Sequence, residues 1–332
     1  MPLINSSYSN PPFYLFNRHL ETVVPSMFRK VEGEYERKRL ELTDGDFLDL
    51  DWMRAQREKL VIISHGLEGS SERHYVKGVA HYFYQRGWDA LGWNCRGCSG
   101  EMNRLPRFYH HGATEDIAAV IDHAIQKKYS HIVLVGFSMG GSMSLKYLGE
   151  RKDQLPSEIK AAVTFSVPCD LGSSARELDK PNKKFYLNRF LKKLEKKIRA
   201  KSLKFPQLIS SEGFENIKTF RDFDNRYTAP LHGFADADDF YTKASSGSFI
   251  STIQIPTLII NAINDPFLPE ACYPFDIAKT SAHVHLETPE RGGHVGFSLA
   301  GMTESWMEVR AFEFINAQIR PEASDRFERS DA

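Results

Sequence analysis

Val133-Leu134-Val135-Gly136-Phe137-Ser138-Met139-Gly140-Gly141 is the stretch of sequence that decides the fold. An apolar, β-branched run leads into Gly-x-Ser-x-Gly, and a segment of helical character comes next. This order of strand, tight turn and helix predicts a nucleophile elbow, in which a strained turn holds the serine hydroxyl above the edge of a sheet. A Cβ at Gly136 or Gly140 would collide with the neighbouring strand or helix, so glycine is expected at both positions. The alternative is a Gly/Ser-rich loop without chemistry, and the flanking strand and helix favour the elbow.

Outward from this stretch, strand and helix patterns alternate through most of the chain. Such alternation predicts an α/β domain with a mostly parallel, doubly wound sheet. Before it, residues 35–42 and 47–53 flank the turn signal Thr43-Asp44-Gly45-Asp46 and predict an antiparallel pair at one N-terminal edge. The other expected strands are 60–64, 89–93, 131–135, 161–167, 255–262 and 284–286, and the expected helices are 75–86, 114–128, 139–149 and 305–319.

Two parts of the chain do not follow the alternation. Residues 171–250 interrupt it, and we interpret them as a helical cap inserted into a core formed by residues 1–170 and 251–320. Residues 1–34 have few secondary-structure signals, and Pro11-Pro12-Phe13-Tyr14-Leu15-Phe16 is typical of an arm that packs its aromatic side chains on the body. The last residues, 321–332, form a polar tail.

One segment of the expected cap is an amphipathic, basic helix. Its apolar stripe lies among lysines and arginines, which is typical of a solvated helix face. The alternative is a weak attraction to the surface of an anionic membrane. The stripe consists of Leu187, Phe190, Leu191, Leu194 and Ile198, and the basic residues are Lys192, Lys193, Lys196, Lys197 and Arg199.

Composition excludes several classes of protein. Lys and Arg number 43 and Asp and Glu also number 43, so no global charge argues for nucleic-acid binding. The first residues lack the basic and apolar regions of a signal peptide, and no apolar run approaches the ~20 residues that span a bilayer. We therefore expect a soluble, cytoplasmic protein without a transmembrane segment.

The cysteines predict neither disulfides nor a metal site. Cys95, Cys98, Cys169 and Cys272 are irregularly spaced in a long chain, which is not the pattern of a disulfide framework. Cys95 and Cys98 form a C-x-x-C, but no second ligand pair with zinc spacing accompanies them. We expect a pair of reduced, partly buried thiols.

A serine hydroxyl needs a base to act as a nucleophile, and the base needs an acid to orient it. In a fold built on this elbow the three residues follow the chain order serine, acid, histidine. Asp265 follows the strand expected at 255–262, and His294 follows the last short strand, in Gly292-Gly293-His294. We therefore predict a catalytic triad of Ser138, Asp265 and His294.

Other residues compete for these roles. Asp170 also follows a strand, but the elbow fold usually places its acid after the later strand, which favours Asp265. The chain has twelve histidines, and a given histidine is more often structural than catalytic. His65 lies beside a loop that approaches the serine, and that position indicates a structural role.

An oxyanion hole should accompany the triad. One backbone N–H belongs to Met139, directly after the serine, where the start of a helix adds its positive end. The second should come from the loop after the strand ending at Ser64, and Leu67 is the expected donor.

Several further motifs resemble the YheT-like branch of the α/β-hydrolases, bacterial relatives of eukaryotic membrane-anchored α/β-hydrolase-domain lipases and of yeast ethyl-ester synthases. The resemblance runs from about residue 11 to about residue 318. The matching segments are 17–22 (NRHLET), 44–52 (DGDFLDLDW), 65–71 (HGLEGSS), 94–101 (NCRGCSGE), 136–141 (GFSMGG), 222–224 (DFD) and 228–234 (TAPLHGF).

The resemblance implies an α/β-hydrolase fold and a serine esterase or lipase that acts on carboxylic esters without a cofactor, through Ser138, Asp265 and His294. We expect a small-molecule ester with a short- to medium-chain acyl group as substrate. Two alternatives stay open: an alcohol O-acyltransferase of the same fold, and a catalytically silent fold that binds a ligand.

Overall fold

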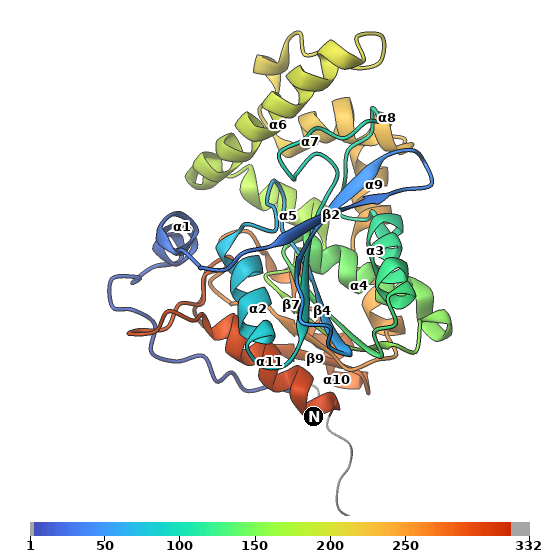
Figure 1. Ribbon diagram of the computed structural model, residues 1–332. Coiled ribbons are helices and arrows are strands. Elements are labelled where there is room, and N and C mark those ends of the chain that lie inside the picture. The colour runs from blue at the N-terminus through green and yellow to red at the C-terminus, as the bar shows by residue number, and fades with distance from the viewer. Residues whose placement is uncertain (1–2, 320–332) are drawn as a thin grey trace, which may run out of the picture.

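A single mixed sheet forms the centre of the computed structural model, which describes residues 3–319 (Figure 1). In these residues nine strands pair in the order β1-β9-β8-β7-β6-β4-β5-β3-β2. The six strands from β9 to β5 in this order are parallel, and β3 and β2 form the antiparallel N-terminal edge. The predicted fold class is confirmed; the tail expected at 321–332 lies outside the described residues. The strands are β1 (Leu3–Ile4), β2 (Glu36–Glu41), β3 (Phe47–Met53), β4 (Lys59–Ser64), β5 (Asp89–Asn94), β6 (His131–Phe137), β7 (Ile159–Phe165), β8 (Thr257–Ile260) and β9 (Val284–Glu287).

The central strands have apolar side chains on both faces, because helices cover the sheet on both sides. Leu60, Ile62 and Leu134 point to one face, and the intervening Val61 and Val133 point to the other, as the period of two requires. Helices α2 and α11 pack on the second face, and α3 and α4 on the first (Figure 1). Their bounds are α2 (His74–Tyr84), α3 (Thr114–Gln126), α4 (Met139–Arg151) and α11 (Trp306–Ile319); the short α10 (Phe275–Thr280) precedes β9.

The register of the sheet brings several loops to one edge. Gly136 of β6 pairs with Ser64 of β4 and with Thr164 of β7, and Ile260 of β8 pairs with Glu287 of β9. The carboxyl ends of these parallel strands therefore lie side by side. The loops that leave them carry every residue of the predicted triad.

The segment 171–252 lies beyond this edge of the sheet as a group of helices (Figure 1). The apolar stripe predicted in its basic helix is buried at Leu187, Leu191, Leu194 and Ile198, so this face is fixed by packing. The helices are α5 (Leu171–Leu178), α6 (Lys184–Lys204), α7 (Phe220–Phe223), the π-helix η4 (Asp224–Thr228), α8 (Ala229–His232) and α9 (Ala237–Ala244).

The prediction for the N-terminal arm was wrong in two respects. Phe13 and Phe16 are 91% and 74% exposed, and of the run 13–16 only Leu15 is buried. Residues Arg18–Phe28 form helix α1. Asn17 caps its N-terminus, because its side chain accepts hydrogen bonds from the amides of His19 and Leu20. The helix escaped prediction because Pro25 lies within it and its buried residues, Glu21 among them, include polar ones.

No helix within residues 3–319 is long and apolar enough to cross a membrane.

Candidate active site

Ser138 lies in a strained turn between β6 and α4. Its backbone has φ 52° and ψ −117°, a conformation that L-residues rarely adopt. A Cβ at Gly136 would lie 2.7 Å from the carbonyl oxygen of Gly140, and one at Gly140 would lie 2.3 Å from that of Ser64. Both glycines are therefore required by the close approach of helix and strand, as the elbow pattern predicts.

Three side chains from three loops form a hydrogen-bonded chain at this turn. The Oγ of Ser138 lies 3.0 Å from Nε2 of His294, and Nδ1 of His294 lies 2.8 Å from Oδ2 of Asp265. The other carboxylate oxygen of Asp265 accepts a hydrogen bond from the amide of Phe267 at 2.8 Å. Asp265 is buried, and the ring of Phe267 stacks on the imidazole at a centroid distance of 4.0 Å. The site can therefore hold the imidazole with its proton on Nδ1 and its free nitrogen facing the hydroxyl.

Asp170, the competing acid, has a different role in the structure. Its carboxylate accepts a hydrogen bond from the amide of Ser173 at 2.7 Å and caps the N-terminus of α5. Asp170 therefore stabilises a helix end and makes no hydrogen bond to His294.

Helix α1 braces the loops that carry Asp265 and His294, and sequence reasoning missed this contact. The carboxylate of Glu21, 1% exposed, accepts hydrogen bonds from Asn264 at 2.7 Å, from the Arg291 guanidinium at 2.8 Å and from the amide of Gly292. The hydroxyl of Thr22 accepts from the amide of His294 at 2.9 Å. The signal available in the sequence was Asn17-Arg18-His19-Leu20-Glu21-Thr22, in which a helix cap precedes an acidic residue in the first turn.

The two predicted oxyanion donors lie on either side of Ser138. Met139 is the first residue of α4, whose first amides have no partner within the helix. The loop that carries Leu67 approaches closely, because a Cβ on Gly66 would lie 3.2 Å from the Cβ of Ser138. Leu67 lines the same cavity as Ser138.

His65 is buried with both ring nitrogens occupied. Nδ1 donates to the carbonyl oxygen of Gly66 at 2.7 Å, and Nε2 accepts from the amide of Cys95 at 3.1 Å. Burial lowers its pKa to about 4, so the ring stays neutral and holds the Leu67 loop against β5. The position is structural, as expected.

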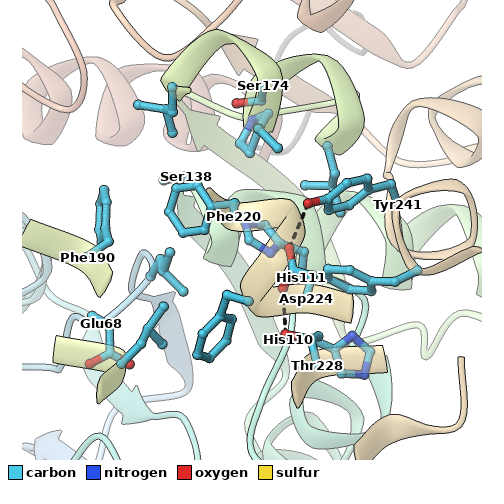
Figure 2. Close-up of a pocket in the computed structure, with 18 of the residues that line it drawn as sticks. Glu68, His110, His111, Ser138, Ser174, Phe190, Phe220, Asp224, Thr228 and Tyr241 are labelled. Atoms are coloured by element: carbon cyan, nitrogen blue, oxygen red, sulfur yellow. Dashed lines mark hydrogen bonds between the residues drawn. The ribbon is translucent and has the colours of Figure 1, made fainter. Parts of the chain in front are cut away.

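A mostly apolar cavity of about 1000 Å³, partly open to solvent, extends from Ser138 and His294 under the helices of segment 171–252. We call it the apolar cavity. Figure 2 shows Phe190 and Phe220 facing its interior. Its apolar lining includes Leu67, Phe108, Leu171, Leu178, Leu194, Phe223, Phe240 and Leu268.

Polar groups also line part of the apolar cavity. The carboxyl group of Asp224 accepts hydrogen bonds from the hydroxyls of Thr228 and Tyr241, at 2.5 and 2.8 Å (Figure 2). Burial raises the pKa of Asp224 from 3.8 to about 7, against the opposing effect of these two donors.

Cys95 and Cys98 are reduced in the structure, as are the other two cysteines. Burial raises the pKa of both thiols, which is typical of inert cysteines. Residues 3–319 contain no cluster of three metal-ligating side chains.

Comparison with known proteins relates this chain to a family and to several relatives. The family model described as alpha/beta hydrolase fold matches residues 59–300. The chain is 34% identical to "Putative esterase YheT" of Escherichia coli (strain K12), over 91% of each chain. It is 29% identical to phospholipase ABHD3 of Homo sapiens, over 96% of this chain and 80% of that protein. Among solved structures, the esterase PF2001 of Pyrococcus furiosus superimposes with a TM-score of 0.58 at 17% identity, over 95% of this chain and 99% of that one.

Proposed function

The chain belongs to the YheT-like group of the α/β-hydrolase fold family, and from that premise we propose that it is a serine carboxylic-ester hydrolase with the triad Ser138, His294 and Asp265. The observation that carries the proposal is the hydrogen-bonded chain from Asp265 through His294 to Ser138. Relatives named esterase, phospholipase and monoacylglycerol lipase support the same class of reaction.

In the proposed mechanism, Ser138 Oγ attacks the carbonyl carbon of the ester while His294 Nε2 takes its proton. Asp265 holds the Nδ1–H tautomer and stabilises the imidazolium that forms. The backbone N–H groups of Leu67 and Met139 stabilise the oxyanion. When the acyl–oxygen bond breaks, His294 gives its proton to the departing alcohol, and the acyl group stays on Ser138. Water then attacks the acyl-enzyme by the same steps and releases the acid.

We further propose that segment 171–252 acts as a cap and that the apolar cavity holds the acyl chain. The phenylalanine and leucine side chains that line it favour a hydrocarbon chain. Asp224, Thr228 and Tyr241 interrupt the apolar lining with polar groups that bond one another, so a long chain that reached them would gain less from burial than one that stays among the apolar side chains. Short- to medium-chain acyl groups should therefore be preferred.

The test is hydrolysis of a p-nitrophenyl ester series of increasing chain length. Ser138→Ala should lower kcat by about 10⁶-fold, because it removes the nucleophile. A fluorophosphonate should add covalently to Ser138, and peptide mass analysis would locate the adduct. Ser142→Ala is a matched control in the same helix, because within residues 3–319 the hydroxyl of Ser142 donates only to the carbonyl oxygen of Pro168. A folded wild-type protein that hydrolyses no ester of the series would indicate a silent, ligand-binding fold instead.

A further inference from the structure

A second cavity reaches Ser138 and His294 from the side of α1 and the N-terminal half of α6. It comprises about 750 Å³ of space, part of which is open solvent. It shares Leu67, Ser138 and His294 with the apolar cavity, so the two meet at the serine. An ester bound at Ser138 therefore has one space for each of its halves.

We call this second space the basic cavity. Its charged residues differ from those of the apolar cavity. Arg73, Arg189 and Lys193 line the basic cavity, and no Asp or Glu does so among the described residues. None of the three forms an ion pair within residues 3–319, whereas Lys197, one turn along α6, pairs with Glu68 at 2.8 Å. Three cations without an ion pair among these residues, in one cavity of a chain with zero formal net charge, favour an anionic ligand.

The three charges are close enough to affect one another. Burial lowers the pKa of Lys193, and the positive charges of Arg73 and Arg189 contribute to the same shift, while the negative charge of Glu68 opposes it. The ammonium group of Lys193 donates a hydrogen bond to the carbonyl oxygen of Glu68 at 2.9 Å, and the carboxylate of Glu68 pairs with Lys197 instead. An anion in the cavity would relieve this repulsion.

The N-terminus of α2 adds donors at the same place. Arg73 is the N-cap residue, and no side chain caps this eleven-residue helix. His74, 7% exposed, lines the cavity, and its Nδ1 has no hydrogen-bond partner in the described part of the chain; the same holds for Nε of Arg73. A helix N-terminus with free donors and guanidinium groups is the usual surrounding of a bound phosphate.

We propose that the basic cavity receives the alcohol half of the ester and binds a phosphate group on it through Arg73, Arg189, Lys193 and the N-terminus of α2. This inference rests on the proposed ester hydrolysis and names its substrate class, acyl esters of phosphate-bearing alcohols. One water is consumed per ester, the acyl–oxygen bond breaks, and the phosphate-bearing alcohol takes the proton from His294. The phosphate itself stays intact.

The test compares two substrates with the same acyl group, octanoyl glycerol and octanoyl glycerol phosphate, both kept monomeric. For Arg73→Gln, Arg189→Gln and Lys193→Gln, the ratio of kcat/KM for the phosphate ester to that for the neutral ester should fall about tenfold each, through KM. Lys192→Gln and Lys196→Gln remove the same charge from exposed positions of α6 and should leave the ratio unchanged. An unchanged ratio in the three cavity variants, or an equal fall in the two controls, would overturn the subsite.

Vesicles containing a long-chain acyl glycerol phosphate distinguish a lipid headgroup from a soluble phosphate ester. If the vesicle-bound ester is turned over faster than the monomeric ester, the phosphate belongs to a lipid headgroup. If it is turned over more slowly, the phosphate belongs to a soluble ester. Both results support the subsite if the cavity variants lose turnover of the monomer. A loss seen on vesicles alone would indicate attraction to a charged surface and overturn the subsite.

Binding separates failure of this inference from failure of the proposed function. Glycerol 1-phosphate should bind to Ser138→Ala in calorimetry, and additional Arg73→Gln should weaken that binding about tenfold, whereas glycerol should not bind. If wild type hydrolyses neither ester, the proposed function fails, and the calorimetric result still decides the phosphate site. If it hydrolyses both esters and glycerol 1-phosphate does not bind, only the subsite fails.

Discussion

Asp170 and Asp265 show how residues of one type at one edge of a sheet acquire different roles. Both come after a parallel strand, but Asp170 accepts from the first turn of α5 while Asp265 accepts from His294. The difference comes from the segment on the C-terminal side of each aspartate. A helix begins directly after Asp170, so its carboxylate is used by that helix.

Exchanging each acid for its amide tests the assignment. Asp265→Asn should lower kcat about 10⁴-fold, because an amide no longer favours the productive tautomer of His294. Asp170→Asn should keep activity and stability close to wild type, since Asn caps a helix about as well as Asp. Steady-state kinetics and thermal melts check both, and an inactive Asp170→Asn beside an active Asp265→Asn would reverse the roles.

At the scale of elements, α1 behaves as a support for the catalytic loops more than as part of the core. Its buried carboxylate Glu21 joins Asn264, Arg291 and Gly292, which belong to the loops of Asp265 and His294. The helix therefore fixes the distance between the acid and the base. An error of about 1 Å in such positioning costs about 10²-fold in rate.

Glu21→Gln should accordingly lower kcat by about 10- to 100-fold. The amide nitrogen of Gln faces Asn264 or the Arg291 guanidinium without accepting a hydrogen bond, so one of these loop contacts is lost. The rate of fluorophosphonate labelling should fall in parallel. Glu32→Gln, exposed and just beyond α1, is the control; full activity in Glu21→Gln at an unchanged Tm would contradict the bracing role.

The helices of segment 171–252 contain a buried acid that should make their stability depend on pH. The pKa of Asp224 is about 7 in the folded protein, and its ordinary value is 3.8, so between these values the folded chain holds a proton that the unfolded chain has lost. Stability should therefore fall as pH rises from about 4 to about 7 and then level off. Asp179 adds to the shift by charge repulsion, and Tyr241 donates to the carboxylate.

Thermal unfolding at pH 5.5 and pH 8 measures this effect. Asp224→Asn should reduce the loss of Tm between the two values by roughly 3 °C, because titration of this group costs about 2 kcal/mol over the interval and 1 kcal/mol shifts the Tm of a 332-residue chain by only ~1.4 °C. Other groups titrate equally in both proteins, and Asp276→Asn, whose side chain is 97% exposed, should behave as wild type. An identical pH dependence in Asp224→Asn would place the pKa of Asp224 near its ordinary value.

At the scale of the whole molecule, the sequence predicted the features that short segments determine by themselves. Continuous apolar runs define the strands β4 and β6, and the glycines at 136 and 140 define the turn between β6 and α4. The chain order of Ser138, Asp265 and His294 was enough to name three residues that the structure brings into one hydrogen-bonded chain.

The features that escaped prediction depend on partners far away in the sequence. Strand β1 has two residues and exists because it pairs with β9. The contacts of Glu21 with Asn264 and of Thr22 with His294 join residues 243 and 272 positions apart. No local pattern contains such partners, and the exposed Phe13 and Phe16 show that aromatic character alone does not establish burial.

The same long-range contacts determine when, during synthesis of the chain, the site can form. A ribosome makes α1 before Ser138, and it makes the histidine that would activate this serine 156 residues after the serine. Until then, Thr22 of α1 lacks the His294 amide that it accepts from in the folded protein. A nascent chain released before residue 294 would expose a serine without its proposed base. The ability to cleave an ester would thus be acquired only after residue 294 has been made, 156 residues after the nucleophile.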